Sequence, residues 1–372
     1  MGGHPCGHKI GFEALSGDCV TALNINLFTA NTPSTSGTWT FSVTQKQIIR
    51  AAAIDLGAID PQEDLTAQEY SDCSFKLNMM TKQWMGNTDF APGLKIWTRR
   101  RADLFMGVSK FAYNLGQTGD HWVDSTAGLA YPQSYGQTYV ATSVAANATT
   151  IPVASVAQQN IGDYVGILNG NDIYWTKITN LNPVPNPPTM TIQTGVPNAI
   201  TASAVTYVWN YTNKAVRPLS IITCVLRDIY ANDTPLNFMT TERYESLPTK
   251  VAPTNVADPT AILYESQFTN QSPNGILYLD VAGAQDVTKR LHCVYLAPTQ
   301  DLVNPGDSPD YPQQWYRALT WGHAKDIASM FDCEWTQTME QNLTEALAIA
   351  KQADPATTDV YFEPYAESPY TP

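Results

Sequence analysis

The feature that most constrains the fold of this chain is a change in the spacing of its apolar residues. Between residues 42 and 86, apolar side chains recur at every third or fourth position, which is the spacing of two amphipathic helices paired as a hairpin. Between residues 121 and 215 that spacing disappears, and short runs rich in Thr, Val and Asn predict strands instead. The chain is therefore expected to combine a helical part with a β part.

Local signals predict where the first two helices begin. Ser42 with Gln45, and Thr66 with Glu69, have the spacing of a capping box, in which each side chain bonds the backbone of the other residue. Such a pair satisfies two backbone N–H groups that have no partner inside the helix. The two pairs therefore predict helix starts just after residues 42 and 66.

Glycines predict the C-terminal ends of the same two helices, at Gly57 and Gly86. The side chains expected to face inward are Ile48, Ile49, Ala52, Ala53 and Leu56, followed by Tyr70, Cys73, Leu77, Met80 and Trp84. Stripes as regular as these indicate packing between helices rather than a binding site.

Shorter elements are expected along the rest of the chain. Residues 94–115 predict two or three short strands, and Asn169 with Gly170 lies between two apolar runs, as in a β-hairpin. A short helix is expected within residues 240–250, and two further helices between residues 312 and 350. The strands predicted to form a small antiparallel meander are residues 261–268, 275–283 and 291–298.

These elements predict an α+β protein of several domains, because 372 residues exceed one ordinary hydrophobic core. Its centre is expected to be an α-helical hairpin or bundle with the small antiparallel meander, interrupted by an inserted all-β domain. The predicted parts are an N-terminal extension (1–40), the core (41–120 and 216–353), the inserted β-domain (121–215) and an extended C-terminal arm (354–372).

The charge of the chain argues against broad contact with nucleic acid. Its 21 Lys and Arg face 34 Asp and Glu, a net charge of −13, whereas DNA binding requires neutralised phosphates. Arg99, Arg100 and Arg101 form the basic run of the sequence. Successive strand residues point to opposite faces, so these three do not make one anion pocket. A solvated edge or loop is favoured over a contact with DNA or a partner.

The sequence contains no motif of a known catalytic, phosphate-binding or metal site, so the chain is expected to be non-enzymatic and without a cofactor. His4, Cys6, His8 and Cys19 match no standard metal spacing. His323 is expected to be a hydrogen-bonded structural residue rather than a base. Four cysteines in apolar runs are expected to be buried reduced thiols of an intracellular protein: Cys73, Cys224, Cys293 and Cys333. With no signal peptide and no run of 18 apolar residues, no membrane segment is expected.

The end of the sequence, DVYFEPYAESPYTP at residues 359–372, combines aromatic residues with prolines and acids. Its aromatic side chains are Tyr361, Phe362, Tyr365 and Tyr370. The prolines prevent a regular helix, yet four rings are a large apolar area to leave in water. The segment is either a loose terminus or an extended arm that becomes ordered on a partner, with its rings in the partner's pockets.

Several segments resemble, in the same order, the head-to-tail adaptor family of short-tailed bacteriophages, also called tail accessory factors or head completion proteins. The first is the helical hairpin TQKQIIRAAAIDLGAIDPQEDLTAQEYSDCSFKLNMMTKQW. The later ones are RPLSIITCVLRD, ERYESLPTK, GILYLDVAG, LHCVYLAP and YPQQWYRALTWGHAKDIASMF. Together they cover about residues 41–115 and 216–353; the insertion at 121–215 and residues 1–40 depart from the family pattern.

The resemblance implies a structural virion protein at the head–tail junction, assembled in the host cytoplasm. It implies a homo-oligomeric ring, usually of twelve copies, that docks beneath the portal protein and forms part of the DNA channel. DNA would pass through its lumen without specific binding. The C-terminal arm would reach the portal or a neighbouring copy, and the inserted β-domain would contact a downstream nozzle, fibre or spike.

Two other functions remain open from the sequence. The chain is alternatively another tail component, such as a tube or fibre-attachment protein, that uses residues 121–215 as its binding module. A virion-associated cell-wall hydrolase is the third possibility, because paired carboxylates across a cleft leave no local sequence signature.

Overall fold

The fold is taken from a computed structural model, which describes residues 40–85, 99–124, 135–203, 206–248, 258–266, 273–280 and 286–352. The chain divides into two compact units, Met1–Ser42 and Val43–Pro372. Apart from residues 40–42, the first unit lies outside the described residues, so the elements below all belong to the second.

The described part of the chain is mostly β, with fifteen strands in three sheets and five α-helices. The prediction of an α-helical bundle as the core of residues 41–120 and 216–353 was therefore wrong. Residues 99–124 and 220–296 supply strands to two sheets that share one apolar core. Stretches such as 290–296 are buried almost throughout, which suits a strand covered on both faces.

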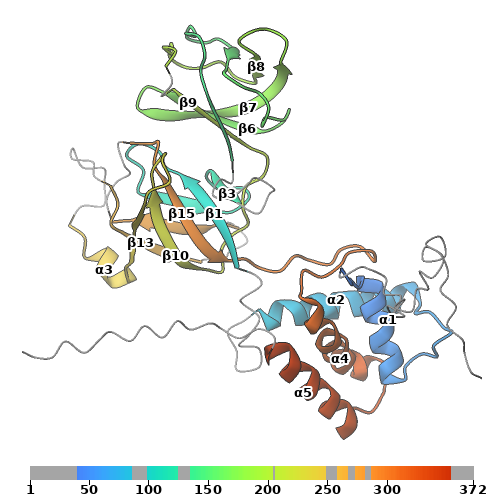
Figure 1. The fold of residues 1–372 in the computed structure, drawn as a ribbon. Helices are drawn as coiled ribbons and strands as arrows, with labels where there is room; N and C mark the ends of the chain where they lie inside the picture. The colour runs from blue at the N-terminus through green and yellow to red at the C-terminus, as the bar shows by residue number, and fades with distance from the viewer. Residues whose placement is uncertain are drawn as a thin grey trace, which may run out of the picture. The chain divides into compact units, whose positions relative to one another are not determined.

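Four helices form a separate helical part: α1 (Gln45–Leu56), α2 (Ala67–Trp84), α4 (Tyr316–Ile327) and α5 (Gln337–Gln352). Two 3₁₀ turns flank α4, η1 (Gln313–Trp315) and η2 (Ala328–Met330). Helix α4 packs against α1, α2 and α5, so segments from the two ends of the described chain lie side by side (Figure 1). Their shared core surrounds Trp315, Leu319 and Ile49.

The helix ends follow the predicted signals with one exception. Thr66 and Glu69 form the predicted capping box, and Gly57 ends α1 in the left-handed conformation (φ 78°). Helix α1, however, is capped by Thr44 rather than Ser42. Gln45 cannot serve as the reciprocal partner because its amide is buried, where it donates to Leu302 O (3.1 Å). The predicted stop of α2 at residue 86 lies outside the described residues.

The two sheets with the shared core are built from distant segments. The five-stranded sheet has the order β11 (Asp233–Pro235), β10 (Ser220–Arg227), β15 (Arg290–Leu296), β1 (Arg99–Phe105), β3 (Trp122–Asp124). The four-stranded sheet has the order β12 (Asn237–Phe238), β13 (Ala261–Glu265), β14 (Gly275–Leu279), β2 (Ala112–Leu115). The short helix α3 (Thr241–Glu245) lies where it was predicted.

The predicted meander of three consecutive strands was wrong. Strands β13 and β14 do pair, but β15 lies in the other sheet, between β10 and β1. The apolar sequence of β15 shows that the strand is buried. It does not show which two strands pair with it.

Pairing of β10 with β15 also corrects the prediction for two cysteines. Cys224 lies directly opposite Cys293, and the two form a disulfide, so they are not reduced thiols. Their separation of 69 residues hides the pairing from the sequence. Cys73 is free and buried, and Cys333 is free and half-buried.

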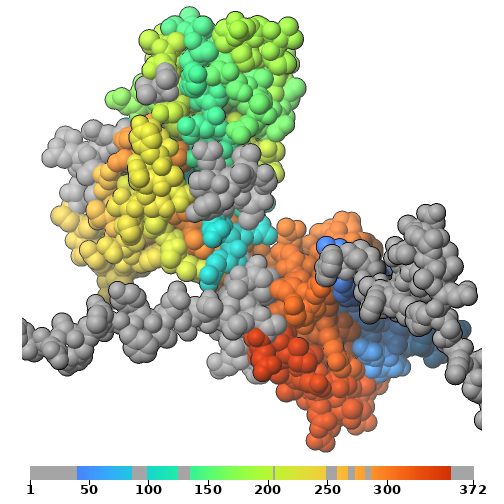
Figure 2. Space-filling model, in the orientation of Figure 1, coloured from blue at the N-terminus to red at the C-terminus, as the bar shows by residue number. Residues whose placement is uncertain are grey.

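The third sheet has six strands, all between residues 136 and 211, and encloses a core of its own. Its order is β4 (Gly136–Tyr139), β9 (Tyr207–Tyr211), β6 (Tyr164–Asn169), β7 (Asp172–Asn182), β8 (Thr189–Ile192), β5 (Thr150–Pro152). The predicted hairpin is confirmed: β6 and β7 are joined by a two-residue turn at Gly170 and Asn171, with Gly170 at φ 69°. The space-filling view shows these residues as one continuous green body (Figure 2).

Candidate functional site

Within the described ranges, no three His, Cys, Asp or Glu residues come close enough to hold a metal ion. No helix in that part of the chain is long and apolar enough to cross a membrane. One cluster of polar and aromatic side chains surrounds His121, and two hollows of greater volume lie on the helical part.

His121 lines a cavity of about 230 Å³ beside Phe105 and Trp175. Its ring stacks on Trp175, with the ring centroids 3.8 Å apart, and its Nδ1 lies 2.5 Å from the Tyr211 hydroxyl. Next to it, Lys110 Nζ donates to Asp120 Oδ1 at 2.5 Å.

The geometry around His121 is that of a packed junction rather than a catalytic centre. Burial, with the nearby charges of Lys214 and Lys110, lowers the pKa of His121 to about 3. The imidazole is therefore neutral near pH 7 and does not exchange protons in that range. The second oxygen of Asp120 accepts the Asn114 N–H at 2.7 Å, so both carboxylate oxygens are engaged. The cluster holds β7 against residues 105–121.

The first hollow on the helical part, here called the α2 groove, has a volume of about 550 Å³ and lies between α2 and residues 301–303. Three apolar side chains that line it are unusually exposed, Phe75 at 67%, Met79 at 57% and Val303 at 75%. Large apolar side chains grouped in this way are typical of a surface that contacts another molecule.

Polar bonds hold the two walls of the α2 groove together. Asn78 Nδ2 donates to Leu302 O at 2.9 Å, and Leu302 N–H donates back to Asn78 Oδ1 at 2.9 Å. Lys82 Nζ lies 2.6 Å from Asp301 Oδ1 and donates to Thr299 O at 2.5 Å. The groove is thus formed before any partner arrives, and little ordering remains to be done on binding.

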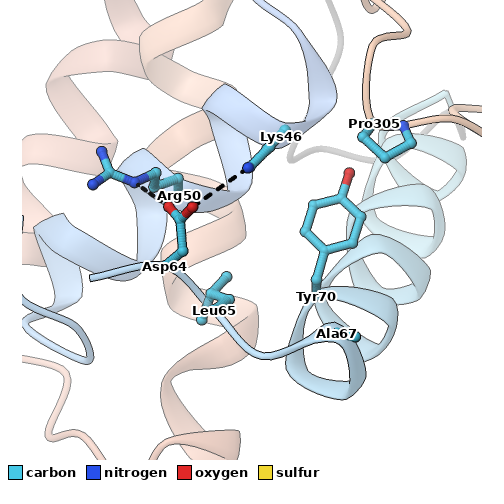
Figure 3. A pocket seen from close by; sticks show the side chains of 7 residues that line it. All are labelled: Lys46, Arg50, Asp64, Leu65, Ala67, Tyr70 and Pro305. Carbon is cyan, nitrogen blue, oxygen red and sulfur yellow. Dashed lines mark hydrogen bonds and ion pairs between the residues drawn. The ribbon is translucent and has the colours of Figure 1, made fainter. Parts of the chain in front are cut away.

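The second hollow, here called the α1–α2 pocket, has a volume of about 430 Å³. Figure 3 shows its lining residues: Lys46, Arg50, Asp64, Leu65, Ala67, Tyr70 and Pro305. Asp64 accepts from Arg50 Nε at 2.9 Å and from Lys46 Nζ at 3.5 Å. The hydrogen bond from Arg50 and the charge of Lys46 lower the pKa of Asp64. The pocket therefore keeps an ionised carboxylate between two cations.

The predicted site residues are not brought together in the described structure. Arg99, Arg100 and Arg101 lie on β1 and pair with β15, whereas β3, on the other side of β1, pairs only with Ala102, Asp103 and Leu104. Arg100 is paired with Asp124 (3.3 Å) and Asp310 (3.8 Å), whereas its two neighbours are exposed. A contact of this run with DNA or a partner stays a prediction.

The other predicted site residues are outside the described ranges. They are Tyr361, Phe362, Tyr365 and Tyr370 of the C-terminal arm. The predicted role of this arm stays a prediction. His4, Cys6, His8 and Cys19, for which no metal site was expected, also lie outside the described ranges.

Sequence reasoning missed the α2 groove. Phe75 and Met79 are four residues apart and lie off the inward stripe of α2, a spacing that places them on one outer face. That signal was available in the sequence. The contribution of Val303 was not, because Val303 lies 224 residues after Met79 (303 − 79). The hydrogen bonds expected for His323 were also wrong: its side chain is fully buried, and neither ring nitrogen has a hydrogen-bond partner among the described residues.

Neither a protein-family model nor a curated protein sequence matches this chain.

Proposed function

We propose that the chain is a structural virion protein, a head-to-tail adaptor of a short-tailed bacteriophage that self-associates into a ring beneath the portal. The ordered series of segments described above suggests the family. The observation that carries the proposal in the structure is the α2 groove, a preformed apolar surface on the helical part that suits contact between copies.

The apolar residues of the α2 groove favour a partner energetically. Full burial of a side chain such as Phe75, Met79 or Val303 contributes roughly 1.5–3 kcal/mol. The bonds between Asn78 and Leu302 already hold the groove in shape, so less of that gain is lost to ordering.

The charge of the protein favours this surface for contact between copies. Each copy has a net charge of −13, so two copies repel each other unless they meet through uncharged areas. In the α2 groove, the charged lining residues Lys82 and Asp301 neutralise each other. The rest of the groove lining is apolar or amide in character, as in the core of a protein interface.

The test replaces Phe75 and Met79 together by serine. Particle masses with and without the portal protein of the same phage are measured by mass photometry. The unchanged protein is expected to form rings, and the double variant is expected to assemble at least tenfold less well, because the apolar contact is lost. A matched control replaces Ile161 and Phe238 by serine in the same way. These side chains are 64% and 48% exposed and do not line the α2 groove, so the control is expected to assemble normally.

An unchanged protein that stays monomeric with the portal at all salt concentrations contradicts the proposal. The acidic charge adds a second expectation, that the ring binds DNA negligibly at about 150 mM salt, since phosphate contacts weaken steeply with salt. Electrophoretic mobility of duplex DNA with the assembled ring measures this.

A further inference from the structure

The α1–α2 pocket has two chemically different sides. Figure 3 shows Lys46, Arg50 and Asp64 on one side and Tyr70 with Pro305 on the other. Arg50 is committed to the turn between the helices, since its Nη2 also donates to Pro61 O at 2.5 Å. Lys46 is held less firmly: its Nζ lies 3.5 Å from Asp64 Oδ2, and its side chain is 56% exposed. The pocket therefore places a largely exposed cation, with a long contact to Asp64, beside an apolar wall.

This arrangement selects for a particular kind of ligand. Among the residues that line the pocket, two cations face one carboxylate, although the charge of Asp307 also acts on Tyr70. The wall of Tyr70 and Pro305, with Leu65 and Ala67, suits aromatic rings or prolines. An extended peptide with acids, aromatic residues and prolines would match both sides at once.

The chain carries such a peptide itself. Residues 359–372, DVYFEPYAESPYTP, contain Asp359, Glu363 and Glu367 and no Lys or Arg. The segment follows α5, which ends at Gln352, so residues 353–372 reach up to about 65 Å when extended. That length allows the segment to reach a second copy of the chain.

The geometry points to a specific contact: the α1–α2 pocket of one copy receives residues 359–372 of a neighbouring copy. Lys46 would pair with a carboxylate of the arm, and an arm ring would lie against Tyr70 and Pro305. Each copy then offers one arm and accepts one, a head-to-tail contact of the kind that closes into rings. The inference rests on the proposed self-association.

The experiment places a photo-crosslinking phenylalanine analogue at position 362 of the full-length chain. Unlabelled and ¹⁵N-labelled copies are mixed before irradiation, and crosslinked peptides are identified by mass spectrometry. The expected product joins position 362 of one copy to a peptide within residues 46–70 of the other isotope. Mass photometry of the same samples records whether rings form.

Charge variants of the pocket test the pairing that we infer. Lys46→Glu is expected to lower the crosslink yield about fivefold, because an ion pair is replaced by repulsion. Lys46→Arg keeps the charge and is expected to restore the yield. Circular dichroism shows whether both variants keep their helices.

Each other outcome overturns the inference in a recognisable way. A crosslink confined to one isotope means that the arm docks on its own chain. Rings without a crosslink to residues 46–70 mean that the arm docks elsewhere, while the proposed function survives. Absence of rings with the portal removes the proposed function, and the contact between copies with it.

Discussion

The helical part and the six-stranded sheet each enclose an apolar core. They differ in the hydrogen bonding of one buried ionisable side chain in each, and in the apolar side chains exposed at one groove of the helical part. The sheet buries the acid Asp163 and satisfies it fully. The helical part buries His323 without a hydrogen-bond partner among the described residues and exposes Phe75 and Met79 beside one groove. The contrast concerns these side chains alone, because the sheet region also has buried polar atoms, on Gln159 and Asn169, without a hydrogen-bond partner among the described residues.

In the sheet, Asp163 is 1% exposed and organises the turn before β6. One oxygen accepts the Thr212 hydroxyl at 2.9 Å, and the other accepts Asn210 Nδ2 and the Asn160 N–H, both at 2.9 Å. Burying a carboxylate is costly unless its lone pairs are bonded in this way. The network therefore fixes the loop that leads into β6.

In the helical part, His323 lies on α4 and is 0% exposed. Burial, with the nearby charge of Lys76, lowers its pKa to about 3. The imidazole is neutral in the folded protein at pH 7, but the unfolded chain takes up a proton below its ordinary pKa of 6.5. Stability from this group is therefore present above pH 6.5 and is lost as pH falls toward 3.

The largest expected effect tests whether the two cores are separate. Trp315→Ala removes a fully buried ring from the helical core and is expected to cost about 4 kcal/mol. Hydrogen exchange should show faster exchange in α1, α2 and α4 and unchanged protection in β6 and β7. Equal loss of protection in both regions would show that the cores unfold together.

The next effect tests whether the sheet depends on its buried acid. Asp163→Leu removes the acceptor of three hydrogen bonds, of whose donors Asn210 Nδ2 still bonds Gln158 O, and is expected to destabilise the protein by about 3 kcal/mol in urea unfolding. Asp163→Asn keeps the shape and part of the acceptor capacity, so it should cost less than half as much. A leucine variant within 0.5 kcal/mol of the parent, a difference of about twofold in equilibrium, contradicts the network's role.

A smaller effect tests the buried histidine of the helical part. Lowering the pH from 7 to 5 is expected to remove about 2 kcal/mol through His323, at roughly 1.4 kcal/mol per pH unit below 6.5. His323→Leu should abolish that contribution. Because His121 has a similarly lowered pKa, the measurement is the difference in pH dependence between parent and variant. Identical pH dependence would show that His323 does not titrate in this way.

The smallest effect concerns the local signal that starts α2. Thr66→Ala removes the oxygen that accepts the Glu69 N–H and is expected to cost about 1 kcal/mol in thermal unfolding. Thr66→Ser keeps that oxygen and serves as the control. If serine is as costly as alanine, packing of the Thr66 methyl group, rather than capping, stabilises this helix start.

Features that depend on a few neighbouring residues were predictable from the sequence. The capping pair Thr66 and Glu69, the stop at Gly57 and the hairpin turn beside Gly170 all work through contacts within four residues. The inward stripes of α1 and α2 were correct for the same reason, since helical spacing alone decides which side chains share a face.

Features that join distant segments were not predictable. The apolar pattern of residues 290–296 indicates a buried strand but does not show that β15 pairs with β10 and β1 instead of β14. A helical bundle was wrongly expected at the centre of the fold. The strands between α2 and α4 are recognisable one by one in the sequence, but their assembly into sheets is not. Of the two hollows on the helical part, the sequence indicates Phe75 and Met79 but not the wall at Val303.

The sequence by itself determined the kinds of element, the ends of several helices and the residues that face inward, because these follow from the geometry of short stretches of backbone. Only the tertiary structure decided strand order, the Cys224–Cys293 pair, the burial of His323 without a hydrogen-bond partner among the described residues, and the composition of the α2 groove and the α1–α2 pocket. Each of these depends on which distant segments meet, and that choice is made by packing of the whole chain rather than by any local pattern.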